Sequence, residues 1–333
     1  MSETTVEEQR ELLEQALFEI KRVIAGQDGM LERVLVCLLA GGHLLIEGVP
    51  GLAKTLTIKT TAQVLGGSFQ RIQFTPDLVP SDLVGTRVFR PSSADFDTEL
   101  GPVFCNFLLA DEINRAPAKV QSALLEVMQE RQVTIGHETH AVPQPFLVMA
   151  TQNPIESEGT YPLPEAQVDR FMLKILVGYP EHDEELTVVQ RSLVAAPELR
   201  RVLELERLLD LQAASAAVYV DPGIISYTVQ LATATRDPGA YGLGDLAPFI
   251  SFGASPRGPI SLVQSARALA FLRGRDYVVA QDVDSLAKDA LRHRLVLSYQ
   301  ALAEQVDADR ILDAVLEKVT APELEVGRRE TAA

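Results

Sequence analysis

The sequence is poor in the features that mark secreted, membrane-spanning and metal-binding proteins. Its 333 residues include only 2 cysteines, Cys37 and Cys105, both in apolar segments, so it has no disulfide framework and no CxxC pair. No apolar run approaches the roughly 20 residues needed to span a bilayer. The first residues lack the basic and then apolar pattern of a signal peptide, and the 5 histidines form no HExxH motif. We therefore expect a cytoplasmic protein.

Positive charge is also scarce. Lysine and arginine number 30 against 46 acidic residues, which gives a formal net charge of −16 and a pI near 4.8. The average field repels a phosphate-rich partner, and this weighs against nucleic-acid binding without excluding a local basic pore. Solubility is the simplest explanation of the acidity. The hydrophobic fraction, 47%, is enough for a full core.

The two halves of the chain differ in their hydrophobic pattern. In the first half, short apolar segments alternate with helical ones, which predicts an α/β domain with a parallel sheet flanked by helices. The expected strands are 44–47, 69–75, 107–110, 146–151 and 172–177, and the expected helices are 6–20, 30–40, 54–65 and 119–130. After Tyr179-Pro180 helical periodicity dominates, at 184–194, 222–235, 260–271 and 280–297, with a loop rich in Gly and Pro over 237–257. We predict a nucleotide-binding α/β core over residues 1–180 and a small all-helical domain over residues 181–333.

A phosphate-binding loop is predicted where the first apolar strand ends. The segment reads Gly48-Val49-Pro50-Gly51-Leu52-Ala53-Lys54-Thr55 and leads into a helix. Gly48 and Gly51 allow backbone N–H groups to turn inward around a polyphosphate, beside a helix N-terminus. Lys54 can reach the β- and γ-phosphates, and the Thr55 hydroxyl can ligate Mg²⁺. Ala53 stands where a second glycine is usual, and alanine still allows a helical N-terminus. The predicted nucleotide contacts in this segment are Gly48, Val49, Pro50, Gly51, Leu52, Ala53, Lys54, Thr55 and Leu56.

A second strand ends in two acids, Asp111 and Glu112. A carboxylate at the tip of a buried strand costs free energy unless a cation lies beside it. Asp111 is placed to hold Mg²⁺, and Glu112 to polarise an attacking water. Asn153 follows the strand 146–151 and can orient water or contact a γ-phosphate. Arginines, by their fork geometry and fixed charge, suit a phosphoryl-transfer transition state.

These blocks together resemble the MoxR family of AAA+ ATPases over nearly the whole chain. The matching segments are 48–55, 110–116, 150–154, 163–171 and 254–257. The resemblance implies that Asn153 is the sensor-1 residue, Arg170 the arginine finger offered to a neighbouring subunit, and Arg257 the sensor-2 arginine of the lid. It places Ile24, Gly26 and Gln27 at the adenine. Arg115 is an alternative residue for the contact across the subunit boundary, or it stabilises the region of Glu112.

Two further segments fit the same resemblance. Residues 75–103 resemble the insertion in helix 2 that marks this clade, and residues 132–143 resemble the hairpin that precedes sensor 1. In the assembled ring of the family, both usually face the pore or a client. As exposed hairpins, they equally suit surface segments without a function.

The resemblance implies an ATP- and Mg²⁺-dependent, chaperone-like ATPase that works as a hexameric homo-oligomeric ring and matures or activates partner complexes. A partner protein with a von Willebrand factor A domain is typical of the family. Two alternatives stay open at this point. One is a DNA-acting motor, which the acidic charge and the lack of a basic, aromatic module count against. The other is the ATPase subunit of a magnesium-chelatase-like complex.

Overall fold

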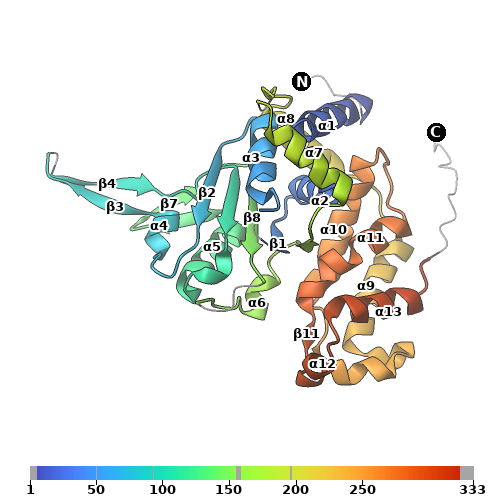
Figure 1. Ribbon diagram of the computed structural model, residues 1–333. Helices are drawn as coiled ribbons and strands as arrows, with labels where there is room; N and C mark the ends of the chain where they lie inside the picture. Colours follow the sequence, from blue (N-terminus) through green and yellow to red (C-terminus); the bar gives the residue numbers. More distant parts are fainter. Residues whose placement is uncertain (1–5, 50, 93, 155–158, 196, 323–333) are drawn as a thin grey trace, which may run out of the picture. The chain divides into compact units, whose positions relative to one another are not determined.

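The computed structural model describes residues 6–49, 51–92, 94–154, 159–195 and 197–322 (Figure 1). It divides into two compact units, Met1–Ala216 and Ala217–Ala333, which are described separately. Within the described ranges, no helix combines the length and the hydropathy that a bilayer crossing requires.

The first unit is built around a parallel sheet of 5 strands in the order β2-β5-β8-β1-β9. These strands are β1 (Leu44–Gly48), β2 (Phe69–Gln73), β5 (Phe107–Asp111), β8 (Leu147–Gln152) and β9 (Leu173–Val177). All are expected strands, with ends shifted by a residue or two. The carboxyl ends of parallel strands share one edge of a sheet, where ligands of open α/β sheets bind.

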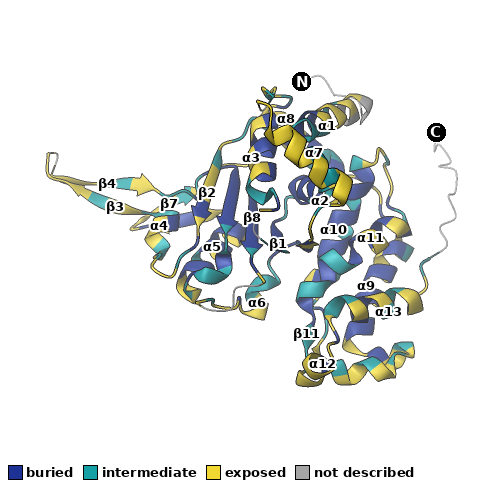
Figure 2. Cartoon of the chain, in the orientation of Figure 1, coloured by how far each residue is buried: buried dark blue, intermediate teal, exposed yellow. Residues whose placement is uncertain are grey.

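Both faces of this sheet are covered, which explains why the central strands are continuously apolar. On one face, Leu108 of β5 and Val148 of β8 pack with Val120 and Leu124 of helix α5 (Ala118–Glu130). Helices α2 (Asp28–Leu39) and α3 (Lys54–Val64) also contact strands of the sheet. Burial along the central strands is nearly complete (Figure 2).

Two hairpins leave this α/β core. Helix α4 (Pro80–Val84) leads into β3 (Gly85–Arg90) and β4 (Asp95–Leu100), and β6 (Gln132–Ile135) pairs with β7 (Glu138–Ala141). The β3–β4 hairpin projects from the unit and is largely exposed (Figures 1 and 2). Phe89 and Phe96 face each other across it, with ring centroids 5.2 Å apart, and the Arg87 guanidinium lies 5.1 Å from the Phe96 ring centroid. The hairpins occupy the two segments predicted as the helix-2 insertion and the hairpin before sensor 1.

The first unit continues past the last strand of its sheet. Helices α1 (Val6–Lys21), α6 (Glu165–Val168), α7 (His182–Ser192) and α8 (Leu205–Ala216) complete it. Gln212 of α8 donates from Nε2 to the Leu38 carbonyl over 2.6 Å, and Arg191 of α7 donates from Nη1 to the Lys21 carbonyl over 3.0 Å. The division of the structure at Ala216 therefore falls later than the change predicted after residue 180, because side-chain contacts hold α7 and α8 to the first unit. The division into a nucleotide-binding core and a lid by function stays a prediction.

The second unit is helical, as predicted, apart from a two-stranded ladder of β10 (Ile250–Phe252) and β11 (Val296–Leu297). Its helices are α9 (Pro222–Arg236), α10 (Arg257–Leu272), α11 (Ala280–Leu291), α12 (Tyr299–Ala303) and α13 (Ala308–Lys318). The segment predicted as a loop over 237–257 contains β10 and two 3₁₀ turns, η2 (Pro238–Tyr241) and η3 (Gly244–Phe249). The helix predicted over 280–297 ends at Leu291, and a 3₁₀ turn, η4 (Arg292–Arg294), follows.

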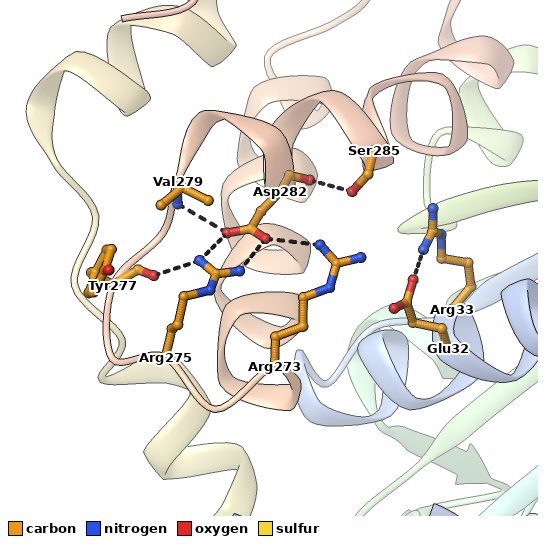
Figure 3. A network of polar contacts seen from close by, with 8 residues as sticks. All are labelled: Glu32, Arg33, Arg273, Arg275, Tyr277, Val279, Asp282 and Ser285. Carbon is orange, nitrogen blue, oxygen red and sulfur yellow. Dashed lines mark hydrogen bonds and ion pairs between the residues drawn. The ribbon is translucent and has the colours of Figure 1, made fainter. Parts of the chain in front are cut away.

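A buried carboxylate fixes the connection between α10 and α11 (Figure 3). Asp282 is fully buried, and it accepts from the Val279 backbone N–H at 3.0 Å. Arg275 meets its two oxygens with Nη1 and Nη2 at 2.7 and 2.5 Å, and Arg273 Nη1 lies 3.3 Å from Oδ1. A buried charge is tolerated only with such partners, so these two arginines hold the first turn of α11 in the second unit.

A buried histidine joins the sheet to α5 in the first unit. His43 Nδ1 accepts from the Val148 backbone N–H at 3.0 Å, so the ring proton lies on Nε2, which is 3.2 Å from the Met128 carbonyl oxygen. Burial lowers the pKa of His43 from 6.5 to about 4. The ring is therefore neutral at physiological pH, and both of its nitrogens are used by the fold.

This histidine makes the stability of the first unit depend on pH. Its pKa is lower in the folded chain than in the unfolded chain, so the unfolded chain binds the proton more readily below about pH 6.5. We expect its contribution to fall by about 3 kcal/mol as the pH drops from 6.5 to 4, at roughly 1.4 kcal/mol per pKa unit. Urea unfolding at several pH values measures this. The His43→Gln variant should lose that part of the slope, whereas exposed His137 serves as the control through His137→Gln. An unchanged slope in His43→Gln contradicts the assignment.

Candidate active site

The predicted phosphate loop lies at the carboxyl edge of the sheet, between the end of β1 at Gly48 and the start of α3 at Lys54. Gly51 has φ +88° and Ala53 φ +55°, both in the left-handed region. For alanine this conformation costs about 1 kcal/mol. Glycine is therefore favoured at residue 53 because it adopts this left-handed backbone conformation without strain. Pro50, a predicted contact, lies outside the described residues.

Gly48 has a role that the sequence did not reveal. It pairs with Val177 of β9, and a Cβ at residue 48 would stand 2.6 Å from the Val177 carbonyl oxygen. A real Cβ does not approach a backbone oxygen so closely. Gly48 thus permits the close approach of β1 and β9, in addition to the predicted part in the loop.

Lys54 carries a partly desolvated charge in this loop. Its Nζ donates to the Gly48 carbonyl at 2.8 Å. Burial lowers its pKa, while the nearby Asp111 and Glu112 carboxylates act in the opposite direction. A half-buried ammonium held by a backbone carbonyl gains from a bound anion. This observation fits a phosphate group at the loop.

Asp111 and Glu112 occupy the end of β5, as predicted. Asp111 Oδ1 accepts from the Thr151 hydroxyl at 2.6 Å, and Oδ2 accepts from Arg71 Nη2 at 2.7 Å. Glu112 has φ +56°, and its backbone N–H donates to Thr151 Oγ1 at 2.8 Å. Its carboxylate pairs with Arg115 Nε at 2.7 Å. Arg115 thus contacts Glu112 within its own chain, which is one of its two predicted roles, and the contact with a neighbouring subunit stays a prediction.

Arg71 and Thr151 were missed by the sequence analysis. Arg71 lies on the edge strand β2, where an arginine is most simply a solvated residue, and Thr151 was counted as an ordinary strand residue. The one available signal was the parallel pairing of neighbouring strands, which brings the ends of β2, β5 and β8 to one edge. Without the strand order, the pairing rule does not tell which residues Arg71 and Thr151 contact.

The predicted sensor-1 and adenine residues also belong to the first unit. Asn153 is buried directly after β8. Ile24 is buried, and Gly26 and Gln27 have φ of +68° and +57°, which turns the chain between α1 and α2. Gln27 Nε2 donates to the Gly178 carbonyl at 3.2 Å, one residue after the Val177 that pairs with Gly48. The predicted adenine segment and the predicted phosphate loop are therefore connected through the end of β9.

The two predicted arginines lie apart from this cluster in the chain. Arg170 follows α6 and is partly buried, and its Nε makes no hydrogen bond to the described residues. Arg257 is exposed and begins α10 of the second unit, where its backbone N–H donates to Ser255 Oγ at 3.2 Å. The structure thus brings together Lys54, Asp111 and Glu112, with Asn153 two residues beyond Thr151. The finger and sensor-2 roles stay predictions.

The oxygen groups at this edge also fit a magnesium ion. Asp111 offers a carboxylate and Thr55, the second residue of α3, offers a hydroxyl. Mg²⁺ prefers such hard oxygen ligands. The cluster therefore has the groups needed to bind a nucleotide phosphate with its metal and to activate water beside it.

The chain is similar to known proteins along nearly its whole length. Residues 43–173 match the ATPase family associated with various cellular activities (AAA), and residues 246–315 match the AAA lid domain. Chaperone MoxR1 of Mycobacterium tuberculosis is 56% identical over 94% of this chain and 83% of its own length. Protein MoxR of Methylorubrum extorquens is 31% identical over 91% of this chain and 93% of its own length. A crystal structure from Cytophaga hutchinsonii superposes with a TM-score of 0.91 at 46% identity, covering 96% of this chain and 97% of the other. With this similarity over nearly its whole length, the chain belongs to the MoxR family of AAA+ ATPases.

Proposed function

We propose that this protein hydrolyses ATP in the presence of Mg²⁺ and uses the energy to remodel, mature or activate partner protein complexes. The observation that carries the proposal is the half-buried Lys54 ammonium beside the Asp111 and Glu112 carboxylates. A positive group for phosphate and negative groups for metal and water stand at one edge of the sheet. This is the set of charges that phosphoryl transfer to water requires.

Each residue then has one task. Lys54 would leave the Gly48 carbonyl for the β- and γ-phosphates, and Thr55 and Asp111 would hold the metal. When bound, Mg²⁺ neutralises charge on the phosphate oxygens. Glu112 accepts the proton of the attacking water. Asn153 orients that water or contacts the γ-phosphate.

The adenine lies at Ile24, Gly26 and Gln27 in this proposal. Gly26 and Gln27 have positive φ and turn the chain between α1 and α2, and the backbone groups of such a turn can hydrogen-bond the edge of a purine. The hydrogen bond from Gln27 to Gly178 supports the proposal, because it ties this turn to the strand that pairs with Gly48. A base and its phosphates are then held by one rigid framework.

We further propose a hexameric ring in which Arg170 completes the site of the neighbouring subunit and Arg257 acts as sensor 2. The printed name of the relative from M. tuberculosis is that of a chaperone, and we transfer this activity to the present chain as part of the proposal. Partners with a von Willebrand factor A domain, and a location in the cytoplasm, belong to the same proposal. The exposed β3–β4 and β6–β7 hairpins are the segments offered to a client or to the pore.

Mixing two inactive variants tests the ring. Arg170→Ala and Lys54→Ala are each expected to be nearly inactive alone. If Arg170 acts across the subunit boundary, some interfaces in a mixture combine an intact loop from one chain with an intact arginine from the other. ATPase activity should then return in part, and activity per subunit should rise with protein concentration.

The control replaces the Lys54→Ala partner by the double variant Lys54→Ala/Arg170→Ala, which supplies no arginine and should restore nothing. If mixed rings form, as native mass spectrometry can verify, and activity still does not return, the ring proposal in this form fails. A crosslinked heterodimer then decides between an Arg170 that acts in its own chain and a need for several intact sites. In the first case Arg115 becomes the candidate for the contact in trans.

A further inference from the structure

The hydroxyl of Thr151 joins the two acidic residues of the site. Thr151 is 1% exposed on β8, and its Oγ1 donates its single proton to Asp111 Oδ1 at 2.6 Å. The same oxygen accepts the Glu112 backbone N–H at 2.8 Å. The hydroxyl thus makes one contact with the carboxylate assigned to the metal and one with the backbone of the residue assigned to the water.

Glu112 needs such a contact because its backbone is held in a left-handed conformation, with φ +56°. A residue with a side chain adopts this conformation at a cost of about 1 kcal/mol, so surrounding groups must select it. The Thr151 oxygen holds the amide side of Glu112. The Arg115 backbone N–H holds its carbonyl at 2.9 Å. Rotation of this peptide would turn the Glu112 carboxylate away from its present direction.

Packing alone does not call for a hydroxyl at this position. A buried position on a parallel strand is well filled by valine, which has nearly the shape of threonine and a high strand propensity. The buried threonines Thr57 and Thr61 bond locally in α3, to the Ala53 and Thr57 carbonyls. Thr151 instead bonds to a residue 40 positions away, on the adjacent strand.

We propose that Thr151 is a positioning residue of the hydrolytic site. It fixes the Asp111 carboxylate and the Glu112 backbone in one arrangement, and it ties both to the strand that leads to Asn153. This inference rests on the proposed ATPase function and adds a residue to it. Thr151 acts through Glu112 and Asp111, without contact with the nucleotide.

Thr151→Val and Thr151→Ser separate the hydroxyl from the shape of the side chain. The valine variant removes both hydrogen bonds and should lower kcat at least about tenfold, because a hydrogen bond to a charged group and a buried N–H partner are lost. The serine variant keeps the hydroxyl and should stay within about threefold of the parent. Thr228→Val, which removes a buried hydroxyl in α9 of the second unit, is the matched control and should leave kcat unchanged. If Thr151→Val does not fold, Thr151→Ala removes the same group without adding a methyl.

A double-mutant cycle then tests the route of the effect. In the Glu112→Gln background and at saturating Mg²⁺, Thr151→Val should lower the residual rate by less than about twofold, since the Glu112 carboxylate is already gone and excess metal offsets a weaker Asp111 site. A second measurement, calorimetric binding of ATP, should show unchanged affinity without Mg²⁺ and a several-fold higher Mg²⁺ concentration for half-maximal enhancement of binding.

Two results would overturn the inference. One is a valine variant with the parent's kcat, and the other is the full tenfold loss repeated in the Glu112→Gln background at saturating Mg²⁺. If the unmodified protein itself hydrolyses no ATP, the proposed function fails. If it hydrolyses ATP and the valine variant does so equally well, only the role of Thr151 fails.

Discussion

Lys54→Ala should weaken ATP binding by about a hundredfold or more while leaving the secondary structure intact. Loss of one member of a desolvated, charge-assisted pair costs about 2–5 kcal/mol, and each 1.4 kcal/mol is a factor of ten in affinity. The fold does not need this side chain. It is only half-buried, and its hydrogen bond goes to a loop carbonyl. Calorimetry measures the ATP affinity, and circular dichroism measures the secondary structure.

Lys59→Ala is the matched control for this experiment. Lys59 lies on the same helix, α3, and its side chain is exposed. It has the same charge, so its loss changes the net charge equally and should leave ATP affinity within about twofold, as is usual for surface positions. Parent-like ATP affinity in Lys54→Ala would contradict the assignment of residues 48–55 as the phosphate loop.

Glu112→Gln should bind ATP as the parent does and hydrolyse it about a hundredfold more slowly or worse. The amide keeps the shape of the side chain and removes the carboxylate that accepts a proton, a contribution of typically 10²–10⁴-fold for a general base. Single-turnover hydrolysis measures the chemical step apart from binding. Glu126→Gln, on an exposed position of α5, is the control.

The same substitution also removes the ion pair with Arg115. Both side chains are partly exposed, 39% for Arg115 and 24% for Glu112, so this pair contributes at most about 1 kcal/mol to folding. A normal melting temperature with slow hydrolysis is therefore the expected combination. Near-parent turnover in Glu112→Gln would move the proton-accepting role to another residue, with Asp111 the first to examine.

The sheet could be predicted from the sequence because its strands are buried on both faces. Continuous apolar runs such as 107–110 have no other simple explanation in a chain that alternates them with helices. The helices of the second unit were harder to predict from the sequence. The turn after Leu291 breaks a helical pattern without a proline or glycine, and α13 (Ala308–Lys318) was not predicted at all.

The residues of the candidate site also differ in how far the sequence could predict them. Lys54, Asp111 and Glu112 could be predicted as site residues because each belongs to a motif that is contiguous in the sequence. Arg71 and Thr151 were not found, because each acts on a residue of another strand and neither has a local signature. Their partners follow from the order of β2, β5 and β8, which is a property of the folded sheet. The packing role of Gly48 could not be predicted for the same reason. A side chain at residue 48 would clash with Val177 on β9, which is distant in the sequence.

The order of the strands also bears on how copies of this chain can associate. β2 and β9 are the edge strands of the sheet, and an unprotected edge invites another strand to add to it. β2 is polar along most of its length, with Arg71 and Gln70 exposed, and β9 carries Lys174, which pairs with Glu47 at 2.7 Å. Polar and charged residues at an edge oppose strand addition, which protects β2 along most of its length and β9 at Lys174, the other residues of β9 being apolar. If copies of this chain associate as proposed, we therefore expect them to meet through side-chain surfaces rather than through a sheet that runs from one copy into the next.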